Sequence, residues 1–260
     1  MKFISTKAEF DCKLYNKKPK WYCIASRPRT GSTLLAEFLD RSGQAGVPLE
    51  YFNSLYIDDF VERCGQFSSK KDYILFLEHY RSTPNGIFGV KAHWDQFSSF
   101  IEYVPADCVF INLYRENIFR QTVSFFKAFN TGNWSKTENE NDTLGAKSYD
   151  FVLMFKYLYY LISINNSWVD FFNKYKKIFI TISYEELNKN RVEVLKQIED
   201  LINIDLSSSY NISPKLKVQS NNLSEFLYKK FIGDIKKFKI QVEYDKINSM
   251  YNIHSPSLKF

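Results

Sequence analysis

Long apolar runs are absent from this sequence of 260 residues. No segment has the length and apolarity of a membrane span, and residues 1–20 are polar and charged rather than signal-like. The four cysteines, Cys12, Cys23, Cys64 and Cys108, lack the spacing of a metal site. These absences argue against a membrane protein and a cysteine-based zinc site. They favour a cytoplasmic protein whose thiols are reduced and buried.

Runs of basic residues are also missing, although the formal net charge is +6. Because the 35 Lys and Arg residues are scattered, the basic excess suits an anionic small molecule but gives no support to a nucleic-acid interface. No internal repeat is present. With 45% hydrophobic and 25% charged residues, the composition is that of an ordinary globular protein. The length predicts a single α/β domain with a sizeable core.

The most informative segment lies near the amino end of the chain. Its apolar residues Trp21 to Ala25 predict a buried strand, a turn with Pro28 and Gly31 follows, and Ser32 to Leu39 predict the start of a helix. Where such a turn meets a helix, free backbone N–H groups and the positive end of the helix dipole converge. This part of the sequence therefore predicts an anion site.

Side chains of the same turn indicate which anion binds. Arg29 would add a cation, and Ser32 and Thr33 would add hydroxyl donors, so a phosphate-like group is expected. A nucleoside-triphosphatase loop, G-x-x-x-x-G-K-[ST], needs a Lys where this chain has Gly31, and the dinucleotide fingerprint G-x-G-x-x-G is missing. An Arg-bearing P-R-T-G-S-T loop is similar to the 5′-phosphosulfate loop of sulfotransferases. The alternatives are another anion-binding turn and a Ser/Thr-capped helix without a ligand.

Further motifs follow in a fixed order: P-L-E-Y-F at 48–52, F-G-V-K-A-H-W at 88–94, L-Y-R-E-N at 113–117 and N-T-G-N-W at 130–134. With these motifs, the chain from about Trp21 to Phe231 resembles the bacterial sulfotransferases of the trehalose 2-sulfotransferase type. These enzymes use 3′-phosphoadenosine-5′-phosphosulfate (PAPS) and no metal. The resemblance implies in-line transfer of the sulfuryl group of PAPS to a hydroxyl of a carbohydrate or glycolipid acceptor. It also suggests a homodimer.

The expected fold is α/β, a P-loop-like three-layer sandwich with a mainly parallel central sheet flanked by helices. The sulfotransferase domain is expected at residues 21–233, after a polar extension at 1–20 and before a basic tail at 234–260. Strands are expected at Trp21–Ser26, Ile87–Ala92, Cys108–Tyr114 and Lys177–Tyr184. Helices are expected at Ser32–Arg41, Ile57–Cys64, Lys71–Arg81, Ile118–Phe129, Ser148–Tyr175 and Arg191–Ile202. Ser207–Asn222 is expected to be a loop. Ligands of such a sheet bind at the carboxyl ends of its strands.

Two segments are expected to bind the donor. The first is the turn, with Arg27, Arg29, Thr30, Gly31, Ser32 and Thr33. In the second, Arg115 and Ser124 match the Arg and Ser with which sulfotransferases hold the 3′-phosphate, a role suited to a planar guanidinium and a hydroxyl. Arg120 shares a helix face with Ser124. Arg120 is either a third donor-binding residue or a surface residue that pairs with Glu116.

Catalysis of this transfer is expected to need a cation and a base besides the donor-binding residues. Arg29 is the first candidate for the cation, and Lys91, at the end of a strand, is the second. Glu50 matches the glutamate assigned as base in the trehalose enzymes, and its apolar neighbours would raise its pKa toward a useful value. His93 is the rival base, because K-A-H is similar to the K-x-H of the animal cytosolic enzymes and histidine has a suitable unperturbed pKa.

The acceptor is less well defined by the sequence. Four aromatic residues are candidates for stacking on a sugar, with core packing as the alternative for each: Tyr51, Phe52, Trp94 and Trp134. Asn53, Asp95 and Gln96 could bind acceptor hydroxyls. The chain also departs from the family where Val218 stands in place of an Arg before Gln219. If that Arg holds the donor, Lys215 or Lys217 would replace it.

Two other functional classes remain open at this point. A P-loop-type nucleotide-dependent phosphotransferase would transfer phosphate from a nucleotide, and the missing loop Lys argues against this class. A non-catalytic nucleotide-binding protein would be expected to have lost the base, whereas Glu50 and His93 are both present. Binding of adenosine 3′,5′-bisphosphate rather than magnesium-ATP would separate a sulfotransferase from the first class.

Overall fold

The computed structural model describes residues 5–12, 17–134, 144–216 and 220–238. The chain forms two compact units. Unit 1 contains residues 1–114 and 167–214, and unit 2 contains residues 115–166 and 215–260. The chain passes from one unit to the other after Tyr114, after Asn166 and after Pro214. The single domain expected from the length stays a prediction.

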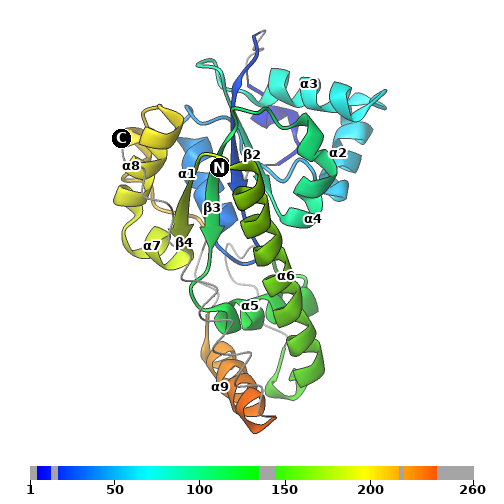
Figure 1. The fold of residues 1–260 in the computed structure, drawn as a ribbon, viewed down its shortest axis with the longest axis vertical. Helices are drawn as coiled ribbons and strands as arrows, with labels where there is room; N and C mark the ends of the chain where they lie inside the picture. The colour runs from blue at the N-terminus through cyan, green and yellow to red at the C-terminus, as the bar shows by residue number, and fades with distance from the viewer. Residues whose placement is uncertain (1–4, 13–16, 135–143, 217–219, 239–260) are drawn as a thin grey trace. The chain divides into compact units, whose positions relative to one another are not determined.

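Unit 1 is built on a four-stranded parallel sheet (Figure 1). The strands are β1 (Lys20–Ala25), β2 (Ile87–Ala92), β3 (Val109–Tyr114) and β4 (Phe179–Ser183), in the order β2-β1-β3-β4. All four strands expected from their apolar runs are confirmed, as is the α/β class. Because the strands are parallel, their carboxyl ends lie at one edge of the sheet.

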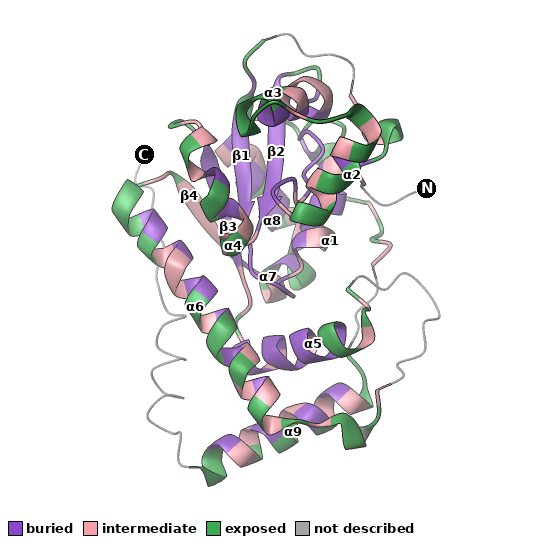
Figure 2. Cartoon of the chain, turned by 90° about the vertical axis from the view of Figure 1, so that its right-hand side faces the viewer, coloured by how far each residue is buried: buried purple, intermediate pink, exposed green. Residues whose placement is uncertain are grey.

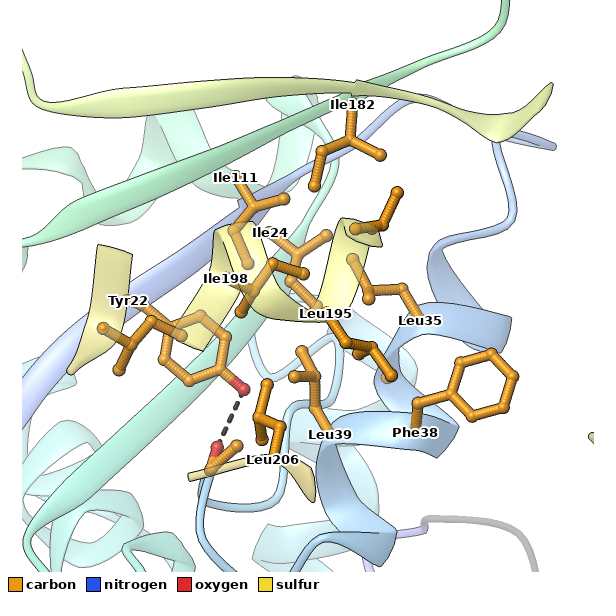
Figure 3. Close-up of a cluster of buried hydrophobic side chains, with 14 of the residues drawn as sticks. Tyr22, Ile24, Leu35, Phe38, Leu39, Ile111, Ile182, Leu195, Ile198 and Leu206 are labelled. Carbon is orange, nitrogen blue, oxygen red and sulfur yellow. Dashed lines mark hydrogen bonds between the residues drawn. The ribbon is translucent and has the colours of Figure 1, made fainter. Parts of the chain in front are cut away.

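One face of the sheet packs on α1 (Ser32–Arg41) and α8 (Arg191–Ile202) (Figure 3). Ile24, Ile111 and Ile182 of three neighbouring strands meet Leu35 and Leu195 of these helices. The apolar residues of each helix recur at helical spacing, so each helix presents one stripe to the sheet. This core fixes the start of α1 against the end of β1.

The other face of the sheet is covered by aromatic side chains. Phe110 of β3 contacts Phe97 of the short helix α4 (Trp94–Phe97), with ring centroids 6.0 Å apart. Phe110 also contacts Phe171, at 5.3 Å, near the carboxyl end of α6 (Phe151–Tyr175). The high aromatic content of the sequence thus serves the core here. Figure 2 shows β1 and β2 buried along most of their length.

Beyond β2, α2 (Ser54–Cys64) and α3 (Lys70–Arg81) complete this side of unit 1. Arg81 at the end of α3 is fully buried. Its guanidinium donates to the backbone oxygens of Ser5 (3.0 Å) and Thr6 (2.9 Å) and pairs with Asp11 at 3.0 Å. The segment at residues 5–12, part of the expected amino-terminal extension, is therefore packed on unit 1.

The remaining elements of unit 1 were not all expected. The 3-10 turns Ala8–Phe10, Ser98–Tyr103 and Ser207–Ser209 are short, and α7 (Tyr184–Lys189) follows β4 directly. The expected helices are confirmed, with α2 beginning three residues before its expected start. Residues 207–209, inside an expected loop, form the last of these turns.

Unit 2 is helical. Its core joins α5 (Ile118–Thr131), the amino-terminal part of α6 and α9 (Asn222–Lys237), with a 3-10 turn at Ala146–Ser148. Phe119, Leu158 and Phe231 are buried in this core. The helix α9 was not expected, and it continues past residue 233, where the expected tail begins. The rest of that tail, from residue 239, lies outside the described residues.

Candidate active site

The turn between β1 and α1 has the backbone geometry expected of an anion site. Arg29 and Gly31 have left-handed conformations, with φ of +67° and +79°. The Thr30 hydroxyl donates to the backbone oxygen of Arg27 at 2.8 Å, which closes the turn. The N-cap of α1 is Gly31, which has no capping side chain, whereas Asn or Ser side chains cap α2, α3, α5 and α7. Gly31 thus has no side chain that would compete with a ligand for the first N–H groups of α1.

Gly31 also packs against an aromatic ring. A Cβ atom added at Gly31 would lie 2.7 Å from Cδ2 of Tyr184, the first residue of α7. Because both the positive φ and this contact exclude a side chain, Gly31 is the residue that the turn requires. The sequence shows the glycine but not the ring, which comes from the end of β4.

Arg27, the first arginine of the turn, is buried, with only 3% of the residue exposed. Its Nη1 atom donates to the backbone oxygen of Ala25 at 3.2 Å and to the Asn112 side-chain oxygen. Asn112 in turn donates to Thr181 on β4, at 3.3 Å. This guanidinium connects the turn with β3, and the contact of Arg27 with a donor stays a prediction.

Glu50 lies beside the end of β2. The backbone N–H of Lys91 donates to the oxygen of Leu49 at 3.0 Å, so the segment before Glu50 follows the strand. The Lys91 Nζ atom is 3.1 Å from Oε1 of Glu50. The other carboxylate oxygen accepts from Gln96 at 3.0 Å and from Asn53 at 3.3 Å. The sequence motifs around Glu50 and Lys91 are thus brought into direct contact.

The pKa of Glu50 is shifted opposite to the sequence-based expectation. Burial acts to raise this pKa, but the charges of Lys91 and His93 and the hydrogen bonds from Gln96 and Lys91 outweigh it and hold it well below its usual range. The expectation of a raised pKa is wrong, because the charges and hydrogen bonds around the carboxylate outweigh the effect of its burial. Glu50 is therefore a carboxylate in an ion pair.

Lys91 contacts the donor turn as well as Glu50. It is only 4% exposed, and its Nζ atom donates to Oγ1 of Thr33 at 3.1 Å. Thr33 lies in the first turn of α1. One buried ammonium group therefore joins the anion site to the carboxylate.

His93 faces protein groups with both ring nitrogens. Nδ1 lies 3.0 Å from Oγ of Ser26, and Nε2 lies 3.8 Å from Oε1 of Glu50. The backbone N–H of His93 donates to Oε1 of Gln96 at 3.1 Å. Gln96, weighed from the sequence as a ligand of acceptor hydroxyls, thus uses its amide to connect Glu50 with His93. Its place three residues after His93 is a helix-capping spacing, which is the sequence signal for this role.

Two of the four aromatic candidates for acceptor binding are core residues. Tyr51 is fully buried, stacks on Phe88 with centroids 5.8 Å apart, and donates its hydroxyl to the oxygen of Val47. Phe52 is 4% exposed and stacks on Phe100 at 4.2 Å. Protein atoms cover both rings, so these two expectations are corrected. For Tyr51 and Phe52, packing in the core is the interpretation that the structure supports.

Trp94 and Trp134 have different surroundings. Trp94 is partly buried and contacts Trp168 edge to face at 5.2 Å. Trp134 belongs to unit 2, is 48% exposed and contacts Phe125 at 5.8 Å. Both retain some accessible surface.

The second donor-binding segment lies in unit 2. Arg115 directly follows β3 in the chain, and Asn117 caps α5 by accepting from the N–H of Arg120 at 2.9 Å. Arg120 forms two hydrogen bonds with Glu225 of α9, one of them 3.2 Å long, and its guanidinium lies 4.4 Å from the ring centroid of Tyr228. Ser124 follows one turn later on α5. The ion-pair alternative for Arg120 is therefore observed, with Glu225 in place of Glu116.

The departure from the family pattern is only partly described. Lys217, Val218 and Gln219 lie outside the described residues, whereas Lys215 is partly buried in unit 2. Within the described ranges, no group of three or more His, Cys, Asp and Glu side chains could hold a metal ion. A search of the same ranges finds no helix suited by length and apolarity to crossing a membrane.

A parallel sheet with a glycine-capped helix start, a carboxylate and a buried lysine at its carboxyl edge is an arrangement typical of α/β proteins that bind an anionic group there. The chain belongs to the Stf0 sulphotransferase family, whose sequence profile matches residues 21–105 and 97–233. It is thus a member of a family of sulfotransferases.

Two curated proteins are similar to this chain. The trehalose 2-sulfotransferase of Mycolicibacterium smegmatis is 25% identical over 158 residues, and the match covers 45% of this chain and 59% of that protein. The trehalose 2-sulfotransferase of Mycobacterium tuberculosis is 24% identical over 247 residues, which cover 78% of this chain and 91% of that protein. The first match thus spans less than two thirds of its relative, and the second spans most of it.

Proposed function

We propose that this protein transfers the sulfuryl group of PAPS to a hydroxyl of a carbohydrate or glycolipid acceptor, without a metal. Family membership and the names of the two relatives support this activity. The observation that carries the proposal is the contact of Lys91 with both Thr33 and Glu50. It joins an anion site to a carboxylate, and a sulfuryl transfer needs both.

The donor turn suits the 5′-phosphosulfate end of PAPS. The N–H groups at the start of α1 and the positive end of its dipole favour an anion. In the proposal, Thr30 and Gly31 contribute backbone N–H groups, while Ser32 and Thr33 contribute hydroxyl donors as well. Arg29 supplies the cation nearest to the phosphate.

The proposed reaction is an in-line displacement at sulfur. The acceptor oxygen forms a bond to sulfur while the bond between sulfur and the bridging phosphate oxygen breaks. The electron pair of the broken bond stays on the 5′-phosphate, giving adenosine 3′,5′-bisphosphate, and the acceptor proton passes to the base. Arg29 and Lys91 offset the charge that develops on the leaving oxygen.

We propose Glu50 as the base, with His93 as its neighbour. His93 has one ring nitrogen at Ser26 and the other directed at Glu50, so both are engaged by the protein. Glu50 has 17% of its side chain exposed, which leaves a path to an acceptor hydroxyl. A histidine held in this way is better placed to orient and stabilise the carboxylate than to receive the proton itself.

For the 3′-phosphate, we propose Arg115 and Ser124 on the strength of the family resemblance. Arg120 is already paired with Glu225, and we propose that it stabilises the contact between α5 and α9. Trp94 and Trp134 remain proposed contacts of the acceptor. A cytoplasmic homodimer also remains a prediction, which light scattering and cell fractionation would test.

The test is transfer of radiolabelled sulfate from PAPS to a panel of saccharides and glycolipids, with products identified by mass spectrometry. We expect labelled product in the absence of metal, and stabilisation of the protein by adenosine 3′,5′-bisphosphate but not by magnesium-ATP.

Glu50→Gln should lower kcat strongly while keeping nucleotide affinity. The matched control is Glu62→Gln, which removes the charge of an exposed glutamate on α2. A folded protein that ignores PAPS would contradict the proposal.

A further inference from the structure

The ammonium group of Lys91 lies between the donor turn and the carboxylate of Glu50. Its Nζ atom lies 3.1 Å from Thr33 Oγ1 and 3.1 Å from Glu50 Oε1. The group is almost completely buried, so its attraction to a nearby anion is weakly screened by solvent. An anion at the start of α1 would therefore compete with Glu50 for the same ammonium group.

The pairing in this structure makes Glu50 a weak base. A carboxylate bonded to an ammonium group, with its other oxygen bonded to Gln96 and Asn53, binds a proton poorly. Proton acceptance from an alcohol would improve if the ammonium group moved toward the donor. Thr33, as the second partner of Lys91, lies on the side from which this attraction would come.

We propose that Lys91 couples donor binding to activation of the base: it pairs with Glu50 before PAPS binds and shifts toward the sulfate when PAPS occupies the turn. This inference rests on the proposed function. In the donor complex, Glu50 takes the acceptor proton as the acceptor oxygen bonds to sulfur. Lys91 meanwhile stabilises the charge left on the 5′-phosphate. Without a donor, Glu50 stays paired and the site does not deprotonate alcohols.

Other charged or titratable groups also face Glu50. His93 approaches it from the end of β2, at 3.8 Å. Tyr56 on α2 has a pKa raised by burial and then by the charge of Glu50. Lys91 contacts both the carboxylate and Thr33 of the donor turn. His93 is the group whose protonation must be distinguished from that of Glu50.

Calorimetry of PAPS binding without acceptor tests the coupling. Titrations in two buffers of different ionisation enthalpy, at several values between about pH 4.5 and 6, give the number of protons taken up per donor. We expect wild-type protein to take up protons, reaching about half a proton where the pH equals the pKa of Glu50 in the complex. The donor's 3′-phosphate itself titrates near pH 6, so its contribution must be subtracted.

Glu50→Gln provides that subtraction, because it retains the donor's phosphate but removes the carboxylate. We expect the difference in uptake between wild type and Glu50→Gln to disappear in a Lys91→Met background. Thr33→Ser should keep the coupling and Thr33→Val should weaken it. If Lys91→Met fails to fold, the Thr33 pair still tests the idea. A pH profile of kcat whose acidic limb is unchanged in Thr33→Val would count against a role for this contact.

The outcomes separate this inference from the proposed function. Failure of folded wild-type protein to bind PAPS would overturn both. Normal binding and sulfate transfer, with equal proton uptake in wild type and Glu50→Gln, would overturn the coupling alone. Loss of uptake in His93→Asn but not in Glu50→Gln would also overturn it, because the histidine would then be the group that titrates.

Discussion

Replacing Gly31 by alanine should disrupt the donor turn for two separate reasons. An L-residue at the observed φ of +79° costs about 1–2 kcal/mol. The new Cβ atom, 2.7 Å from the Tyr184 ring, would add an overpacking cost of about 1–3 kcal/mol. Together these costs are about 2–5 kcal/mol if the turn keeps its shape. A changed turn would avoid them but would misalign the first N–H groups of α1.

Gly43 offers a matched control for this experiment. It also has a positive φ, +68°, but an added Cβ atom would meet nothing within 4 Å among the described residues. Gly43→Ala should therefore lose only about 1–2 kcal/mol of stability and keep its affinity for nucleotide. Urea unfolding gives the stability of both variants, and calorimetry with adenosine 3′,5′-bisphosphate gives their affinity.

We expect Gly31→Ala to bind the nucleotide at least about tenfold more weakly than wild type, which corresponds to about 1.4 kcal/mol. Adding Tyr184→Ala should restore part of any excess loss of stability, because it removes the ring from the position of the new methyl group. Wild-type nucleotide affinity in Gly31→Ala, together with a stability no lower than that of Gly43→Ala, would refute this reading of the turn.

Three further predictions concern unit 1. Arg81→Ala should destabilise the protein by about 1–3 kcal/mol or more in urea unfolding, because it leaves buried backbone oxygens such as that of Thr6 without their donor, while Asp11 keeps its pairing with Arg63. Since the folded pKa of Glu50 lies below its ordinary value of about 4.3, its stabilising contribution is complete above that pH and is lost as the pH falls through the folded value. Glu50→Gln should thus flatten the loss of stability below about pH 4. A thiol reagent should modify exposed Cys64 well before Cys23, whose pKa burial raises.

The strands of this fold were predictable because buried parallel strands are short apolar runs with helices between them. The missed helices had weaker signals. In α7, Ser183 and Glu186 form a capping box that the sequence does display, but the helix is only six residues long. For α9, a run of polar residues up to its cap, Asn221, favoured a loop. The packing that selects these helices involves residues distant in the sequence.

In the candidate site, too, the features set by neighbouring residues in the sequence were predictable, and those set by residues far apart in the sequence were not. That Lys91 and His93 lie close together follows from their places at and just after the end of β2. Glu50 joins them through the pairing of Leu49 with Val90, which the sequence does not display. The direction of the pKa shift does not follow, because Tyr51 points into the core while Lys91 reaches the carboxylate. Sequence neighbours predicted an apolar surrounding, and spatial neighbours supplied an ionic one.

The contacts around Glu50 also bear on whether Glu50 or His93 is the base. His93 lies 3.8 Å from Glu50, and its charge is one of those that hold the pKa of the carboxylate well below its usual range. Lys91 pairs with the same carboxylate, and Gln96 bonds both to that carboxylate and to the backbone N–H of His93. The contacts that fix the position of Glu50 also lower its affinity for a proton. In the proposed mechanism, catalysis then depends on when Lys91 moves away from Glu50. Thr33 in the donor turn is the second partner of Lys91, so the binding of the donor there would cause this movement.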